Sequence, residues 1–279
     1  MRHCTAIRPV ATFIYGSRTL LAAFALQQAT LGEVPESKTF PVKASQGVAV
    51  DAEHFYAISN TKIIQHDKKT GKELGRWQAD RKHKSTAHFK HMNSGTVVGD
   101  KLYCAHSRFP IAPNDSTVEI FVIKKGTIQH EATIPLPKKH GSLTWIDKRK
   151  DGTWWMCYAI YGKPSNQKTK LVEYHKNKGN FVEMKEWYFP AETIARWGSM
   201  SCSGGSWGPG GKLYVTGHDL PEVSVLKLNK AGELKHLKIQ AVPEIYGQAI
   251  AWDRSSPTPV LWGIIKNKQI SQTPLEVKN

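Results

Sequence analysis

A short motif that returns five times along the chain constrains its fold most. Each copy opens on a polar or glycine-containing step, continues into a short apolar strand and turns tightly into further strands. The copies start about 45 to 65 residues apart, which is a spacing typical of propeller arrays. The five openings are Ser45–Val50, His91–Val98, His140–Trp145, Ser203–Trp207 and Gly247–Trp252. Because a propeller brings the same position of every copy to one axis, the repeat predicts a shared axial site.

Each copy is interpreted as one four-stranded sheet. The second strands, such as Trp154–Tyr158, are rich in the aromatic and β-branched residues that favour a packed, pleated surface. An apolar residue followed by proline ends a fourth strand four times, and one such step, Phe40-Pro41, precedes the first copy. The last copy lacks a clear fourth strand. We therefore expect the N-terminal segment to supply the outer strand of the last blade and close the ring.

The predicted fold is all-β, a single five-bladed propeller domain within residues 33–279. Six blades are the alternative, if the long insertion from Ala191 to Cys202 contains further strands. A short helical turn is expected inside that insertion, at Ala191–Arg196.

Residues 1 to about 32 have a different character from the rest of the chain. They carry Arg2, Arg8 and Arg18, no acidic residue, and an apolar run at Leu20–Leu26. This pattern resembles a secretory signal peptide, and its apolar run is too short to span a membrane. A disordered N-terminal extension is the alternative. We expect a secreted or periplasmic protein.

The chain has a formal net charge of +16, which predicts attraction to anions. Its basic residues occupy turns on both faces of the expected ring, so they form no nucleic-acid footprint. The cluster from Arg81 to Lys90 is the best candidate for steering an acidic ligand. The expected partner is an anionic small molecule or glycan, with no specific nucleic acid and no membrane span, and the protein is expected to be a monomer.

Polar residues at the blade entries predict the functional site. The start of a first strand and the end of a second strand lie on the same face of a propeller, so these residues should surround one mouth of the channel. The expected substrate-binding residues are Gln46, Asn93, Ser142, Tyr161, Ser203, Trp207 and Gln248, and the expected catalytic residues are His91, His140, His218 and Arg108. By contrast, Asp51, Asp147 and Asp253 should lie on the opposite face, where capping of a turn explains them.

The residue types at this mouth favour some reactions over others. The repeated inner positions offer no pair of carboxylates, which disfavours glycoside hydrolysis. His91, His140, His218 and Gln248 could hold one divalent metal (Mn²⁺, Zn²⁺ or Ca²⁺) with a position open for substrate. Alternatively, one histidine acts as a general base while Arg108 stabilises an enolate-like charge. Both mechanisms suit removal of a proton next to a carboxylate. In the alternative interpretation, the polar residues at the blade entries only form hydrogen bonds with exposed strand ends or with water in the channel.

Five segments also carry a resemblance to known proteins: His91–Ser94, Gly141–Asp147, Ser203–Gly208, Tyr214–Asp219 and Gly247–Asp253. They look like a group of secreted bacterial propellers often labelled cycloisomerase-like, and the similarity covers nearly all of the chain after the leader. The fungal-type muconate-lactonizing enzymes are larger, seven-bladed propellers. A looser similarity, in residue types but not in spacing or blade number, is to metal-dependent oligogalacturonate lyases with axial histidine and glutamine ligands. Both resemblances imply acidic small molecules or sugars as ligands.

The expected function is that of a lyase or isomerase acting on an anionic sugar or organic acid in the axial pocket. The alternative is a non-catalytic secreted propeller that binds an anionic glycan or a partner protein, because a fold does not fix a function.

Overall fold

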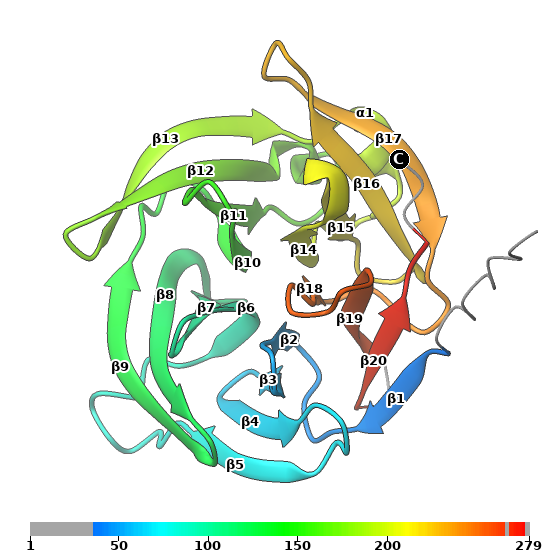
Figure 1. Cartoon of the computed structure of the whole chain (residues 1–279). Helices are drawn as coiled ribbons and strands as arrows, with labels where there is room; N and C mark the ends of the chain where they lie inside the picture. Colours follow the sequence, from blue (N-terminus) through cyan, green and yellow to red (C-terminus); the bar gives the residue numbers. More distant parts are fainter. Residues whose placement is uncertain (1–35, 266–267, 277–279) are drawn as a thin grey trace, which may run out of the picture. The chain divides into compact units, whose positions relative to one another are not determined.

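Five four-stranded antiparallel sheets stand as blades around one axis (Figure 1). The structure, a computed structural model, describes residues 36–265 and 268–276, so the expected leader at residues 1–32 lies outside the described residues. Within a blade the chain runs from the axis outward, and a segment that we call a crossover then leads to the innermost strand of the next blade. The prediction of five blades is confirmed.

The blades are numbered in chain order. Blade 1 contains β2 (Gly47–Val50), β3 (His54–Ser59), β4 (Lys62–Asp67) and β5 (Glu73–Gln78), and blade 2 contains β6 (His91–Val98), β7 (Lys101–Arg108), β8 (Ala112–Lys124) and β9 (Thr127–Pro135). Blade 3 contains β10 (Ser142–Lys148), β11 (Trp154–Ala159), β12 (Lys170–Asn177) and β13 (Asn180–Tyr188), and blade 4 contains β14 (Gly204–Trp207), β15 (Leu213–Thr216), β16 (Glu222–Leu228) and β17 (Leu234–Ala241). Blade 5 contains β18 (Ile250–Trp252), β19 (Val260–Ile265), β20 (Gln269–Pro274) and β1 (Lys38–Pro41).

Helical structure in the described residues is short. It consists of α1 (Ala191–Ala195) and the 3₁₀ turns η1 (Ser165–Lys168) and η2 (Pro209–Gly211). The insertion before blade 4 thus holds the expected helical turn and no hidden strand, which removes the six-bladed alternative. None of these helices has the length and apolar character needed to cross a bilayer.

The N-terminal strand β1 closes the ring as predicted. It pairs antiparallel with β20, in a register that places Phe40 opposite Ile270. Pro41, which has no N–H to donate, is tolerated because β1 is the outermost strand of its blade. The Phe40 ring stacks on Trp262 of blade 5 at 5.8 Å and lies 5.2 Å from the Phe55 ring of blade 1. The strand therefore completes blade 5 and also seals its joint with blade 1.

The hydrophobic core is divided among the five joints between neighbouring blades. Each joint has its own cluster of buried side chains, drawn from the facing sheets and from the crossover between them. The joint between blades 3 and 4, for example, packs Trp155 against Trp187 and Trp207 at 4.9 Å each. Such packing of large aromatic side chains between flat sheets explains the aromatic second strands of the repeat.

The axis itself is almost filled. The space lined by the inner strands of all five blades has a volume of about 10 Å³, which is room for one water molecule at most. This space between the inner strands is therefore too small for a ligand. Side chains from several blades meet there because the inner strands converge.

The buried carboxylate of Asp147 joins four blades at this point. Its Oδ1 accepts a hydrogen bond from Thr96 Oγ1 of blade 2 at 3.1 Å. Its Oδ2 accepts hydrogen bonds from Ser206 Oγ and Trp207 N of blade 4 and from Arg254 Nη2 of blade 5, at 3.1, 2.8 and 2.6 Å. Asp147 was expected only to cap a turn, and its role is wider because β10 ends beside the axis.

A second buried carboxylate, Glu119 on β8, organises the outer part of blade 2. It accepts hydrogen bonds from His88 Nε2 at 3.1 Å and His130 Nε2 at 2.9 Å. The hydroxyls of Thr117 and Thr133 donate to it as well. Burial alone raises the pKa of Glu119, but these four donors outweigh it and bring the pKa to about 2.

Removal of the Phe40 ring should weaken the closure of the propeller. We expect Phe40→Ala to lower the free energy of unfolding by about 3 kcal/mol, because the ring fills the joint between blades 5 and 1. Thr39→Ala, at an exposed position of the same strand, should stay within about 0.5 kcal/mol of wild type. Urea unfolding followed by tryptophan fluorescence measures both, and equal midpoints for the two variants would contradict the account.

Acid should destabilise the protein partly through Glu119 and its neighbour His106. The folded pKa of Glu119 lies below its ordinary value, so its stabilisation is present above pH 4.5 and is lost as the pH falls toward 2. Burial lowers the pKa of His106 to about 4, so stability also falls as the pH drops from 6.5 toward 4.

The variant Glu119→Gln isolates the contribution of the Glu119 carboxylate to the free energy of unfolding. It should cost roughly 3 kcal/mol at pH 7, and this difference from wild type should shrink as the pH approaches 3. Urea midpoints measured between pH 3 and pH 7 test this, and parallel pH profiles for the two proteins would refute it.

Candidate functional site

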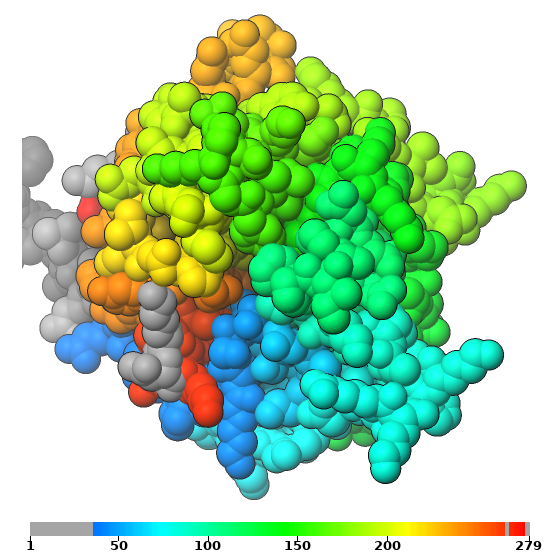
Figure 2. Space-filling model, turned by 180° about the vertical axis from the view of Figure 1, so that it is seen from behind, coloured from blue at the N-terminus to red at the C-terminus, as the bar shows by residue number. Residues whose placement is uncertain are grey.

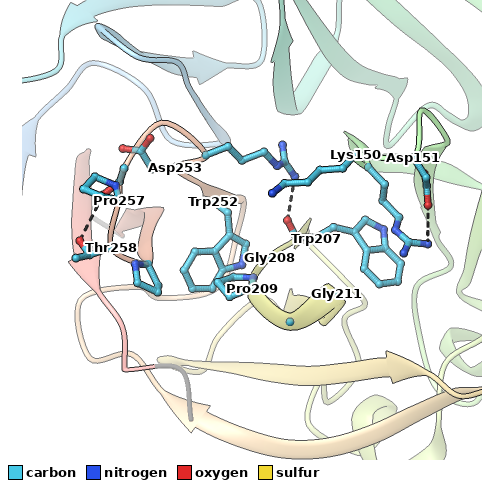
Figure 3. A pocket seen from close by; sticks show the side chains of 15 residues that line it. Lys150, Asp151, Trp207, Gly208, Pro209, Gly211, Trp252, Asp253, Pro257 and Thr258 are labelled. Carbon is cyan, nitrogen blue, oxygen red and sulfur yellow. Dashed lines mark hydrogen bonds and ion pairs between the residues drawn. The ribbon is translucent and has the colours of Figure 1, made fainter. Parts of the chain in front are cut away.

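A cavity lies on the face where the first and second strands of blades 3, 4 and 5 are connected. Its volume is about 510 Å³, within the range of small-molecule sites. It is lined by the turns at Arg149–Asp151, Gly208–Gly211 and Asp253–Pro259 together with Trp207 and Trp252 (Figure 3). We call it the turn-face pocket. The sequence predicted a site on the opposite face of the ring. Figure 2 shows that face.

Two tryptophans and a glycine-rich turn form the wall of the turn-face pocket. The turn Gly208–Gly211 lies between the indoles of Trp207 and Trp252 (Figure 3). A Cβ atom at Gly208 would overlap the Trp252 indole, so only glycine fits there. Gly210 and Gly211 have φ values of +66° and +63°, which other residues adopt at a cost. The glycine-rich segment is thus a tight hairpin, as the sequence indicated, and it also shapes the pocket.

Cations lie along the other side of the pocket. The Arg149 guanidinium sits 4.5 Å from the centroid of the Trp207 ring and 3.3 Å from Asp151 Oδ2. Arg254 Nη2 donates to the backbone oxygen of Trp207 at 2.9 Å in addition to its ion pair with Asp147. The charge of Asp147 raises the pKa of Arg254, so this cation is permanent. Lys150 completes the basic side of the pocket.

The carboxylates that line the pocket are already engaged. Asp253 pairs with Lys68 Nζ at 2.6 Å and accepts hydrogen bonds from Ser255. Burial raises the pKa of Asp253, but Lys68 and Ser255 together outweigh it and hold the pKa below its ordinary value. Asp151 likewise accepts hydrogen bonds from Thr153. Burial raises the pKa of Asp151, but these hydrogen bonds and the charge of Arg149 together hold it below its ordinary value. Both carboxylates are therefore ionised near neutral pH and poorly suited to donate a proton.

Three of the residues predicted from the sequence come together on the opposite face. The His91 ring lies 5.5 Å from the Phe109 ring, which in turn lies 4.9 Å from the Tyr161 ring. Ser142 Oγ donates to Ser107 Oγ at 2.8 Å and also bonds Tyr161. Burial lowers the pKa of His91 and raises the pKa of Tyr161 to about 12, so both groups are neutral near pH 7.

The predicted metal set His91, His140, His218 and Gln248 is not assembled. His140 turns outward to bond Glu183 Oε2 on β13 at 2.8 Å, because its crossover packs along the outer strand of blade 3. His218 Nδ1 instead pairs with Asp219 at 2.8 Å. Among the described residues, one group of three His, Cys, Asp or Glu side chains is close enough to hold a single ion, and its members are His140, Glu183 and Glu186.

The other predicted residues make contacts within the fold. Asn93 Nδ2 donates to the backbone oxygen of Leu143 at 2.9 Å and so joins blades 2 and 3. Arg108 pairs with Asp115 at 3.1 Å. The remaining three form backbone hydrogen bonds at strand entries. Gln46 N donates to Ile58 O, and Ser203 N donates to Thr216 O. The backbone oxygen of Gln248 accepts from Thr216 Oγ1.

Trp207 is the predicted binding residue that lines the turn-face pocket, at the opposite end of β14 from Ser203. Sequence reasoning missed Arg149, Trp252 and Arg254. A usable signal was present, because an arginine closely follows an aspartate near the end of the first strand, in Asp147-Lys148-Arg149 and in Asp253-Arg254. The interpretation of those aspartates as turn caps left the following arginines out of the predicted site.

Comparisons with known proteins support the fold and do not identify a family. No family model matches the chain, and no curated protein matches its sequence. Among solved structures, the allergen Mala s 1 of Malassezia sympodialis is similar, with a TM-score of 0.55, 10% identity, and coverage of 87% of this chain and 96% of that one. A luciferin-regenerating enzyme matches with a TM-score of 0.50, 9% identity, and coverage of 88% and 97%. Virginiamycin B lyase from Staphylococcus aureus matches with a TM-score of 0.47, 12% identity, and coverage of 86% and 99%. At these identities the likeness concerns the fold alone, and the group labelled cycloisomerase-like stays a prediction.

Proposed function

We propose that this protein is a binding propeller that takes an anionic ligand, such as an acidic sugar of a glycan, into the turn-face pocket. The observation that carries the proposal is the placement of Arg149, Lys150 and Arg254 along one cavity of about 510 Å³ with two tryptophans in its wall. Pockets that combine mostly apolar walls with a few fixed charges are typical of small-molecule sites.

The charge balance of the pocket favours an anion. Its three lining cations and the nearby Lys68 face three carboxylates, those of Asp147, Asp151 and Asp253. Asp147 pairs with Arg254, Asp253 with Lys68 and Asp151 with Arg149, which leaves one positive charge in excess among the four cations. The net charge of +16 for the whole chain would attract the same class of ligand from solution.

The walls of the pocket favour a ligand with an apolar ring face. Pro209, Pro257 and Pro259 line the pocket with rigid apolar surface, and the largely buried indoles of Trp207 and Trp252 form part of its wall. Hydroxyls of Ser256 and Thr258 supply polar contacts at the rim. A sugar acid combines a carboxylate, hydroxyls and an apolar ring face, and it therefore fits this composition.

Binding is favoured over the lyase or isomerase activity that the sequence suggested. Among the residues lining the turn-face pocket there is no histidine, and both carboxylates are held by other donors. Proton abstraction next to a carboxylate requires a free base within hydrogen-bond reach of the substrate. The similarity to a luciferin-regenerating enzyme concerns the fold and supplies no such base.

Substitution of Arg149 should weaken binding of an acidic glycan. We expect Arg149→Gln to reduce the affinity for an oligogalacturonate roughly tenfold or more, because a charge-assisted contact is worth about 1.5–3 kcal/mol. Lys148→Gln is the matched control, since Lys148 lies over Trp154 and does not line the pocket. Titration calorimetry on the full chain measures both.

The methyl ester of the same oligosaccharide separates charge from shape. Wild-type protein should bind the ester less tightly than the acid, and added salt should weaken binding of the acid. Equal affinity for acid and ester would contradict the proposal, and release of an unsaturated sugar product would favour a lyase instead.

A further inference from the structure

The outer strands of blades 1 to 4 share one irregularity. In each, a β-bulge leaves one residue without a partner in the neighbouring strand; the four residues are Leu74, Glu131, Met184 and Leu237. Side chains three apart in a regular strand point to opposite faces, but an inserted residue between them restores the same face. The bulge therefore directs two side chains of each outer strand toward the same side of the blade.

In blade 3 these two side chains are Glu183 and Glu186, and both approach His140. His140 belongs to the crossover that enters the blade, and its side chain is fully buried. Its Nε2 lies 2.8 Å from Glu183 Oε2, and its Nδ1 lies 3.8 Å from Glu186 Oε2. One ligand atom from each residue falls within 4.8 Å of the others.

The equivalent place in blade 2 shows how different this group is. There the outer strand supplies His130 and Thr133, the crossover supplies His88, and all three donate to one carboxylate, that of Glu119. Donors and acceptors are matched in blade 2. In blade 3 two carboxylates face a single imidazole, and His140 Nδ1 has no hydrogen-bond partner among the described residues. A buried polar atom without a partner is rare in a native fold.

Two lysines hold the carboxylates from the outside. Lys139 Nζ bonds Glu183 Oε1 at 2.9 Å and so leaves Oε2 facing the imidazole. Lys170 Nζ bonds Glu186 at 3.0 and 3.2 Å. Carboxylates that bind metals are commonly oriented by such partners, which fix the ligand without replacing it.

We propose that His140, Glu183 and Glu186 form a site for one borderline divalent cation of the Zn²⁺ class. One imidazole nitrogen with two carboxylate oxygens suits such an ion, and the partly exposed side of Glu186 leaves room for water as a further ligand. Glu183 and Glu186 approach different ring nitrogens of His140, so a tetrahedral site with bonds of about 2.0–2.2 Å requires one of the two carboxylates to turn toward the nitrogen that binds the ion. The ion would tie the crossover to the outer strand β13, apart from the turn-face pocket.

Titration of the full, metal-free chain with Zn²⁺ alone tests the site. Wild type should bind Zn²⁺ at this site, and Glu183→Gln and Glu186→Gln should each lower the affinity of that site at least tenfold. Glu131→Gln is the matched control, because Glu131 is an exposed residue on the corresponding outer strand of blade 2 and pairs with Lys101. The affinity of Glu131→Gln for Zn²⁺ should equal that of wild type.

Circular dichroism should confirm that every variant is folded, and Zn²⁺ should raise the thermal midpoint of wild type but not of Glu183→Gln. The site is refuted if wild type binds no Zn²⁺, or if the double variant Glu183→Gln with Glu186→Gln retains the wild-type affinity and midpoint shift.

Discussion

The carboxylate of Asp147 is the contact on which the centre of this propeller depends. It lies where the inner strands converge, and it accepts hydrogen bonds from blades 2, 4 and 5 while belonging to blade 3. A buried carboxylate is stable only when donors surround it, and here the donors come from different sheets. The same interaction therefore holds the blades in place and fills the axis.

The position of the candidate site follows from this arrangement. The space between the inner strands has room for one water molecule at most, and the cavity of about 510 Å³ lies between the turns of blades 3, 4 and 5. Arg254 connects the two places, because one Nη atom bonds both Asp147 and the backbone of Trp207. The basic side of the pocket is thus fixed by a group buried at the axis, so that the pocket is organised before a ligand arrives.

The sequence predicted the architecture well because that architecture rests on local chemistry. Strand composition, glycine turns and apolar-proline steps recur in each copy, and the isolated Phe40-Pro41 step revealed the closing strand. The site was harder to predict. His140 occupies a blade entry as expected, yet its crossover turns the ring outward to β13, which no repeat position indicates. Likewise, the partners of Asp147 lie in three other blades and far from it in the sequence, so a turn cap was the simplest interpretation of its pattern.

The free energy of unfolding of Asp147→Asn tests the central claim most directly, with Asp151→Asn at the rim of the turn-face pocket as its control. The carboxamide has the shape of the carboxylate but no charge, and it can satisfy only part of the donor set, so the variant should lose about 3 kcal/mol in urea unfolding. Asp151→Asn should lose less than about 1 kcal/mol, because its pair with Arg149 is partly exposed. If Asp147→Asn unfolds at the wild-type urea concentration, the axial carboxylate does not hold the blades together and the account is contradicted.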